Sequence, residues 1–182
     1  LTYDSPSING VMFKAAYQHD DSTATGQSQD LGHYADFGIQ ISPEMVEGLT
    51  VGYGFGELEP NTTQTVDHET MFVKYAVGGF TLGYQKSEAD GSAATLDDES
   101  TGYAVSYAVN ENFTIAYGER DYEEDTTNTA NTVEQHDSGF SASYTMGGMT
   151  IAGHMNENDN VAGSTDATAD KESYEFALTF AF

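Results

Sequence analysis

Alternation of large apolar and small or polar residues, with a period of two, is the feature that most constrains the fold of this chain. In the last residues, Tyr174, Phe176, Leu178, Phe180 and Phe182 alternate with glutamate, alanine and threonine. The same pattern recurs along the chain, and no segment has a convincing helical period. A period of two places successive side chains on opposite faces of a β-strand. The pattern therefore predicts an all-β protein with essentially no helix.

The alternation predicts eleven strands, at about 1–4, 10–19, 33–42, 49–57, 70–77, 79–87, 101–109, 112–120, 138–146, 149–156 and 173–182. Short connections at 5–10, 43–48, 78–79, 110–111 and 147–148 alternate with long ones at about 20–32, 58–69, 88–100, 121–137 and 157–172. Short turns at one end and long loops at the other are typical of a transmembrane antiparallel up-and-down β-barrel. Such barrels in bacteria have an even number of strands. We therefore expect residues 1–182 to form one barrel domain that is partial, with further strands upstream.

The charge of the chain limits its partners. Its 182 residues include 30 Asp and Glu against 5 Lys and Arg, which gives a net charge of -25. Most of the acids fall in the predicted long loops, so one end of the protein is strongly anionic. Nucleic acid requires a basic surface and is excluded, whereas divalent cations or cationic solutes fit. The absence of Cys excludes disulfides and thiolate metal sites.

Aromatic residues indicate which face meets lipid. Strand parity places every Tyr except Tyr34 and Tyr122, and every Phe except Phe72, on the apolar face. A dry protein core would have to satisfy these phenol hydroxyls, whereas at a membrane interface they meet headgroups and water. We therefore expect the apolar face to contact lipid and the small polar face to line a wet lumen. The predicted aromatic girdle consists of Tyr53, Tyr84, Tyr103, Tyr117 and Tyr174.

Parity also predicts which polar side chains line the lumen: Lys14, Asp36, Lys74, Gln85, Arg120, His154 and Glu175. A Lys or Arg that faces lipid at mid-membrane costs about 2–4 kcal/mol, so the lumen is the favourable place for three of the five cations. Lys86 is expected to point outward near the rim, where a long side chain can snorkel, and Lys171 is expected in a loop. The wall cations could set up a transverse field, or they could be merely solvated in a wet lumen.

Metal and catalytic signals are weak. Asp97, Asp98 and Glu99 could bind a structural Ca²⁺, although no acidic cluster has EF-hand spacing and a solvated loop is the alternative. We expect no other cofactor. His33, His68 and His136 lie near acids and hydroxyls, but no nucleophile motif or HExxH is present. The sequence therefore predicts no enzymatic activity.

Two segments resemble one protein family. LTYDSPSINGVMF at the start is similar to a strand–turn–strand motif of general Gram-negative outer-membrane porins, and YEFALTFAF at the end resembles their closing strand. The resemblance implies a 16-stranded barrel of which this chain supplies the sixth to sixteenth strands, without the constriction loop. It also implies a homotrimer surrounded by lipid and lipopolysaccharide of the outer membrane. In that family the closing strand carries the insertion signal, here Tyr174, Phe176, Leu178, Phe180 and Phe182.

The leading functional hypothesis is a water-filled channel for passive diffusion of small hydrophilic solutes and ions, with a weak preference for cations because acids are in excess. The alternative is an outer-membrane or secreted β-protein with a structural or adhesive role mediated by acidic loops.

Overall fold

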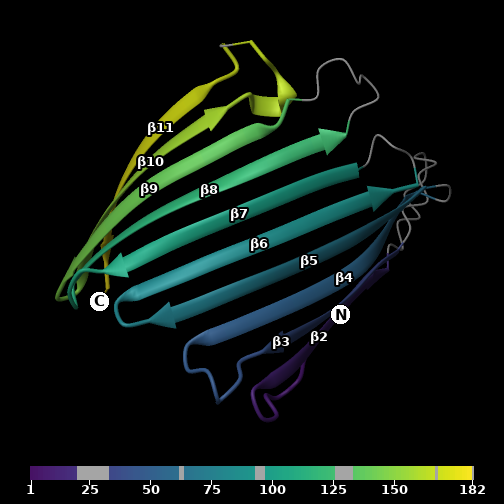
Figure 1. Cartoon of the computed structure of the whole chain (residues 1–182), viewed down its shortest axis with the longest axis horizontal. Helices are drawn as coiled ribbons and strands as arrows, with labels where there is room; N and C mark the ends of the chain where they lie inside the picture. Colours follow the sequence, from purple (N-terminus) through teal and green to yellow (C-terminus); the bar gives the residue numbers. More distant parts are fainter. Residues whose placement is uncertain (20–32, 62–63, 93–96, 126–132, 167, 182) are drawn as a thin grey trace.

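Every strand in the described part of the chain pairs with its neighbours in sequence, in one continuous antiparallel sheet (Figure 1). The structure is a computed structural model that describes residues 1–19, 33–61, 64–92, 97–125, 133–166 and 168–181. This order confirms the predicted up-and-down all-β fold and its eleven strands. The strands are β1 (Thr2–Asp4), β2 (Val11–His19), β3 (His33–Ile41), β4 (Leu49–Asn61), β5 (Gln64–Val77), β6 (Phe80–Gly91), β7 (Asp97–Ala108), β8 (Phe113–Asp125), β9 (Gln135–Met146), β10 (Met149–Asp159) and β11 (Lys171–Phe180).

Helix is nearly absent from the described residues, as the lack of helical periodicity predicts. They contain one 3₁₀ turn, η2 (Val161–Gly163), between β10 and β11. No helix in the described part of the chain is long and apolar enough to span a membrane.

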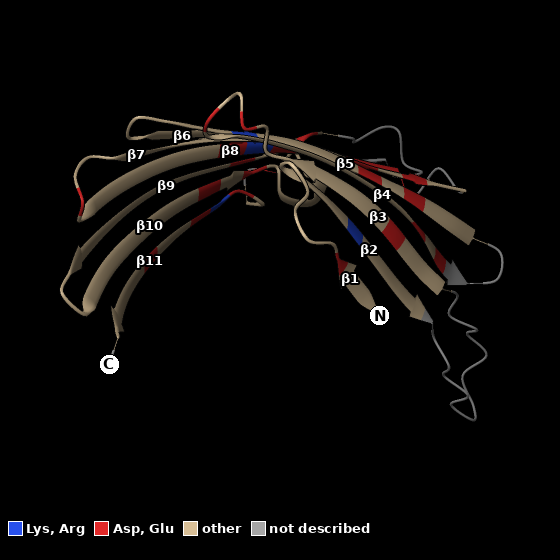
Figure 2. Cartoon of the chain, turned by 90° about the horizontal axis from the view of Figure 1, so that it is seen from below, with Lys and Arg blue, Asp and Glu red and all other residues tan. Residues whose placement is uncertain are grey.

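The sheet bends into an arch, with β6 to β8 near its crown and β1 and β11 at its two feet (Figure 2). Long antiparallel strands twist and coil, which lets a broad sheet curve in this way. The curvature gives the sheet a concave and a convex face.

The strand register places the small and polar residues on one face of the sheet and the large apolar residues on the other. Directly opposed residues share a face, and Gly54 is opposed by Gly38 and Thr70, whereas Phe55 is opposed by Phe37. Continued across the sheet, this pairing gives one face of mostly small and polar side chains and one apolar face. The parity assigned to Tyr and Phe from the sequence agrees with this register in the described residues.

The apolar face has no protein packed against it. Phe13 is 54% exposed, Phe55 51% and Phe176 74%, and among the described residues Val66 is the one buried hydrophobic side chain. A soluble sheet must bury its apolar face against a second layer of structure. No such layer exists in the described part of the chain, so this face is suited to lipid.

Four strand pairs continue further toward the long-connection end than the alternation predicts. β4 ends at Asn61 and β5 begins at Gln64, so the predicted loop at 58–69 is wrong, and the predicted loops at 88–100, 121–137 and 157–172 are likewise too long. The reason is that these strand ends carry polar residues on both faces, as with His68 on one face of β5 and Asp67 and Glu69 on the other. Alternation therefore fades while backbone pairing continues.

Two other predictions concern loops. The predicted loop at 20–32 lies outside the described residues. Lys171 is the first residue of β11 and does not lie in a loop.

Glycine allows one short connection to pass close to its neighbour. Gly48 has a φ of +83°, and its carbonyl accepts a hydrogen bond from the Ala76 amide at 2.9 Å. A Cβ added at Gly48 would lie 2.0 Å from the Ala76 carbonyl oxygen. Only glycine combines this backbone conformation with this approach.

Candidate functional site, the polar concave face

The face of small polar residues is hollowed. A depression of about 670 Å³ extends from β5 to β11, and its lining includes Gln85, Arg120, Asp137, Asn156 and Ser173. A depression that crosses so many strands of one sheet lies on the concave side of the arch. The small residues Gly102, Gly118 and Gly139 also line it and leave the space open, so this surface can hold water.

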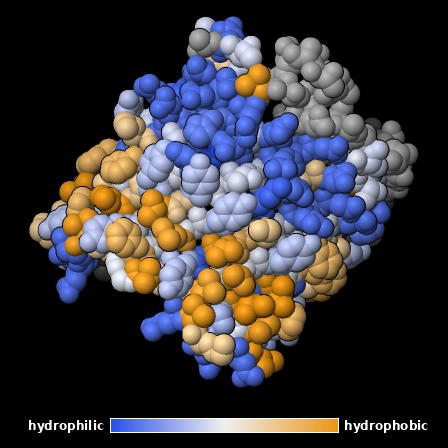
Figure 3. Space-filling model, viewed as in Figure 1, coloured by the Kyte–Doolittle hydropathy of each residue, from blue (hydrophilic) through white to orange (hydrophobic). Residues whose placement is uncertain are grey.

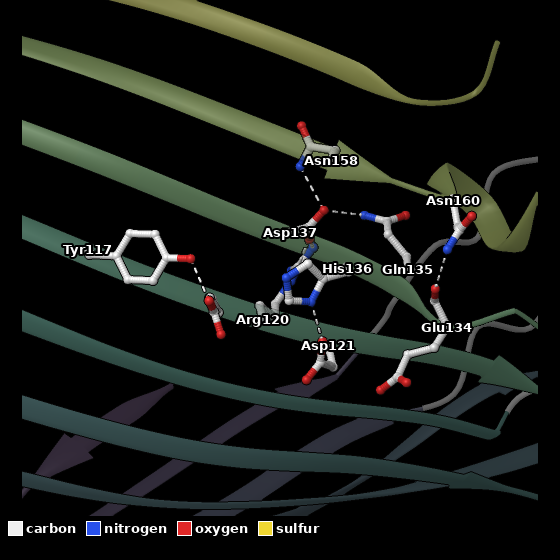
Figure 4. Close-up of polar contacts among 10 residues, drawn as sticks. Tyr117, Arg120, Asp121, Glu134, Gln135, His136, Asp137, Asn158 and Asn160 are labelled. Carbon is white, nitrogen blue, oxygen red and sulfur yellow. Dashed lines mark hydrogen bonds and ion pairs between the residues drawn. The ribbon is translucent and has the colours of Figure 1, made fainter. Parts of the chain in front are cut away.

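The main polar cluster on this face centres on Asp137 (Figure 4). The Arg120 Nε donates to the Asp137 carboxylate at 2.9 Å, with a second contact from Arg120 Nη2. The amides of Gln135 and Asn158 donate to its other oxygen at 2.8 and 2.6 Å. The Asp137 side chain is only 15% exposed, whereas that of Arg120 is 53% exposed. One carboxylate thus joins three neighbouring strands, β8, β9 and β10.

Asp137 lies beyond the tyrosine girdle, in the part of β9 outside the membrane-spanning segment. Burial alone would raise the pKa of Asp137, but hydrogen bonds from Asn158, Gln135 and Arg120 lower it below the ordinary value. The carboxylate therefore stays charged and neutralises Arg120.

All seven residues predicted to line the lumen lie on the polar face. Lys14 pairs with Asp4 at 3.3 Å, and Gln85 donates to the Ser87 hydroxyl at 3.2 Å. His154 lies directly opposite Glu175 in the register. Lys74 and Asp36 have no ion pair in the described part of the chain. The structure does not bring the seven into one cluster.

The sequence did not single out Asp137, Asn158 or Gln135, which organise the polar cluster. All three fall in or next to the segments 121–137 and 157–172, which alternation assigned to loops. Continuing the parity of the neighbouring strands through those segments would have placed Asp137 on the same face as Arg120.

The opposite face carries the tyrosines predicted to form a girdle. Their exposures are 42% for Tyr53, 38% for Tyr84, 47% for Tyr103, 41% for Tyr117 and 70% for Tyr174. The Tyr117 hydroxyl donates to Glu119, and the Tyr174 hydroxyl donates to Glu172 at 3.1 Å. The rings thus adjoin the apolar surface while their hydroxyls meet acids, which suits a boundary between lipid and water.

Acids replace apolar side chains on the outward face beyond these tyrosines. We name this the acidic rim, formed by Glu57, Glu59, Glu69, Glu88, Glu99, Glu119, Asp121, Glu157 and Glu172. Figure 3 shows the division, with hydrophobic atoms gathered toward the short-turn end and hydrophilic atoms toward the other. Lys86 points outward as predicted, and pairs with Glu88 at 2.6 Å and Glu99 at 3.2 Å.

Beside the acidic rim, a histidine forms an ion pair with one of the rim acids. His136 Nδ1 lies 2.6 Å from an Asp121 carboxylate oxygen (Figure 4). This hydrogen bond raises the pKa of His136 above its ordinary value, against the opposing effect of partial burial. Both residues lie beyond the girdle, outside the membrane-spanning segment.

The residues predicted to bind Ca²⁺ lie within a strand. β7 begins at Asp97, so Asp98 projects to the face opposite Asp97 and Glu99. Asp97 accepts a hydrogen bond from the Gly91 amide at 2.7 Å. The three carboxylates do not converge in the described structure, and Ca²⁺ binding there stays a prediction.

The closing strand presents its apolar row outward. Tyr174, Phe176, Leu178 and Phe180 are between 49% and 74% exposed on the convex face of β11. Phe182 lies outside the described residues. A role as insertion signal stays a prediction.

A curved up-and-down sheet with a hydrophilic hollow on one face and an exposed apolar surface on the other defines the class of outer-membrane β-barrels. Over residues 1–162 the chain matches the family described as Gram-negative porin. The chain belongs to the Gram-negative porin family, and its location is the bacterial outer membrane. No curated protein matches the chain.

Solved structures have the same fold. The anion-selective porin from Comamonas acidovorans superposes with a TM-score of 0.80 at 13% identity, over 100% of this chain and 58% of that one. OmpF of Salmonella typhi, in complex with daunomycin, gives 0.73 at 12% identity, over 98% and 60%. OmpT of Vibrio cholerae gives 0.70 at 14% identity, over 87% and 53%. The chain thus spans a little over half the length of these structures, and such identities show the fold alone.

Proposed function

We propose that the protein is a channel for passive diffusion of small hydrophilic solutes and ions, without enzymatic activity. The observation that carries the proposal is the hollowed polar face, backed by an exposed apolar face. Membership of the Gram-negative porin family supports it. A barrel wall with small polar residues inside and apolar residues outside can hold a continuous column of water across a membrane.

Accessibility of two adjacent positions tests the channel. Gly83 lies on the polar face with open space where a side chain would be, and Leu82 lies on the apolar face, 46% exposed. The chain has no Cys, so an introduced thiol is unique in it. In the full-length protein in planar bilayers, we expect a charged thiol reagent to change the conductance of Gly83→Cys and leave that of Leu82→Cys unchanged.

Absence of conductance in the full-length protein would reject the channel. That result would favour the structural or adhesive alternative, which is supported by the acidic rim and the acid-rich connections. A channel whose conductance responded equally at both positions would reject the assignment of the two faces instead.

We further propose a weak preference for cations. Lys14 and Arg120 are paired with carboxylates. Among the described residues, this leaves one predicted lumen cation without an ion pair, Lys74, against two predicted lumen acids, Asp36 and Glu175. The net charge of -25 acts in the same direction. Reversal potentials in a KCl gradient test the sign, and a preference for chloride, as in the anion-selective Comamonas porin, would reject it.

We also propose that the full-length protein is a homotrimer, with lipid and lipopolysaccharide around its apolar face. The exposed apolar face requires lipid or a second subunit to cover it. The mass of the protein in detergent, from light scattering with size-exclusion chromatography, would distinguish a trimer from a monomer.

A further inference from the structure

We propose that His33, Glu57 and Glu59 bind a divalent transition-metal ion such as zinc on the outer rim of the barrel. One imidazole nitrogen and one oxygen from each of the two carboxylates all lie within 4.8 Å of one another. His33 Nδ1 is 3.1 Å from the Glu59 carboxylate. Within the described residues, this is the one group of three or more such side chains that converges in this way.

The strand register brings the three ligands together. β3 and β4 pair with Tyr34 opposite Leu58, so His33 and Glu59 are opposed at the strand ends. Glu57 is two residues before Glu59 on the same strand and therefore on the same face. His33 and Glu57 belong to backbone that is paired in the sheet, and Glu59 lies in β4 where the register with β5 shifts between Leu58 and Asn61.

The donor set selects the class of metal. One imidazole nitrogen with two carboxylate oxygens suits zinc and its first-row neighbours, whereas Ca²⁺ and Mg²⁺ take oxygen ligands alone. Tetrahedral zinc with bonds of about 2.0–2.2 Å holds its ligands about 3.3–3.6 Å apart. In the structure the ligand atoms lie within 4.8 Å of one another, and the His33–Glu59 distance is 3.1 Å, so the observed separations bracket that spacing. His33 and Glu59 are 38% and 36% exposed, so water can occupy the remaining position.

The competing interpretation is a simple ion pair between His33 and Glu59. The presence of Glu57 distinguishes the metal site from the ion pair. An ion pair needs one carboxylate, and a second one beside it adds repulsion between like charges. A divalent cation removes that repulsion and uses both carboxylates. The His33 ring also lies 6.1 Å from the Tyr17 ring, which restricts the orientation of the imidazole.

The site lies on the outward face, away from the hollow. The metal would tie the start of β3 to the end of β4 and place positive charge within the acidic rim. Binding there does not depend on the proposed channel, so the two proposals fail separately.

Calorimetric titration of the full-length protein in detergent with ZnCl₂, in the presence of excess Mg²⁺, tests the site. We expect saturable binding that weakens by more than about tenfold in His33→Ala and in Glu57→Gln, because even outer-shell partners of a metal contribute about 10–100-fold. His136→Ala is the matched control, since it removes another rim histidine that has one carboxylate partner.

Three results would overturn the site. Unchanged zinc affinity in Glu57→Gln would reduce the group to an ion pair. Equal losses in His33→Ala and His136→Ala, or displacement of zinc by Mg²⁺, would indicate a diffuse acidic surface. Conductance measured on the same variants is expected to remain at the wild-type value.

Discussion

At the scale of single residues, Asp137 illustrates how a charge is placed on the polar face. Its side chain is mostly buried among Arg120, Gln135 and Asn158, each of which donates to it. Charge-assisted hydrogen bonds of this kind are stronger than neutral ones, and a buried partner left unsatisfied is costly. The carboxylate therefore both neutralises a wall cation and ties adjacent strands.

Asp137→Asn should destabilise the barrel by about 1–3 kcal/mol, because the neutral amide leaves Arg120 without its charged acceptor. Urea unfolding followed by circular dichroism in lipid vesicles measures the change. Asp98→Asn is the control, since Asp98 also belongs to the polar face and makes no such network with the residues that the structure describes. Equal effects of the two substitutions would show that the network contributes nothing specific.

His136 should titrate with a pKa above its ordinary value, because the hydrogen bond that its imidazole donates to the Asp121 carboxylate favours the charged imidazole. A raised pKa in the folded state gives stability that is fully present below the pKa of the unfolded chain and is lost as pH rises through the folded value. NMR titration of the imidazole is the measurement. Asp121→Asn should lower the pKa, whereas Asp67→Asn should leave it unchanged; no response to Asp121→Asn would contradict the pairing.

At the scale of elements, the short connections and the strand ends follow different rules. The short connections require particular backbone conformations, as at Gly48 and Gly78, which both have positive φ. The strand ends near the long connections have no such requirement and continue as long as their backbones pair. This explains why the short turns were predicted well and the long connections poorly.

Gly48→Ala should be more damaging than Gly78→Ala. Both positions have positive φ, which costs a non-glycine residue about 1–2 kcal/mol. A Cβ at Gly48 would also collide with the Ala76 carbonyl, whereas at Gly78 it would meet nothing within 4 Å. The difference in free energy of unfolding between the two variants isolates the collision. Equal destabilisation would show that the neighbouring chain yields freely.

At the scale of the whole molecule, the outward surface is zoned along the barrel axis. Figure 3 shows hydrophobic residues toward the short-turn end and hydrophilic residues toward the other end. The register places the girdle tyrosines before the acidic rim along the strands. The concave face is polar throughout much of its breadth. Two solvents, lipid outside and water inside, account for this distribution better than a protein core does.

Leu82→Arg should cost about 2–4 kcal/mol of stability in a bilayer, because it places a charge against lipid. Gly83→Arg, one residue further along β6, should be tolerated because it faces open space on the polar side. Folding yield and unfolding in lipid vesicles compare the two. Tolerance of Leu82→Arg together with loss of folding in Gly83→Arg would reverse the assignment of the faces.

Within the described residues, the sequence by itself determined the fold class, the number of strands, the short turns and the face to which the Tyr and Phe side chains point. It could do so because a strand alternates its side chains strictly and because the two faces meet different solvents. The resemblance of its terminal segments to porins also pointed to the family that the match over residues 1–162 establishes.

Only the tertiary structure decided where the strands end beyond the tyrosines and which polar groups meet there. Arg120 with Asp137, and His33 with Glu57 and Glu59, come from different strands, and their contacts depend on cross-strand register. Register beyond the membrane leaves no trace in hydrophobic periodicity, because both faces of the strand are then in water. The sequence pattern indicates whether each face of a strand meets lipid or water. Pairing across strands determines which polar side chains come into contact.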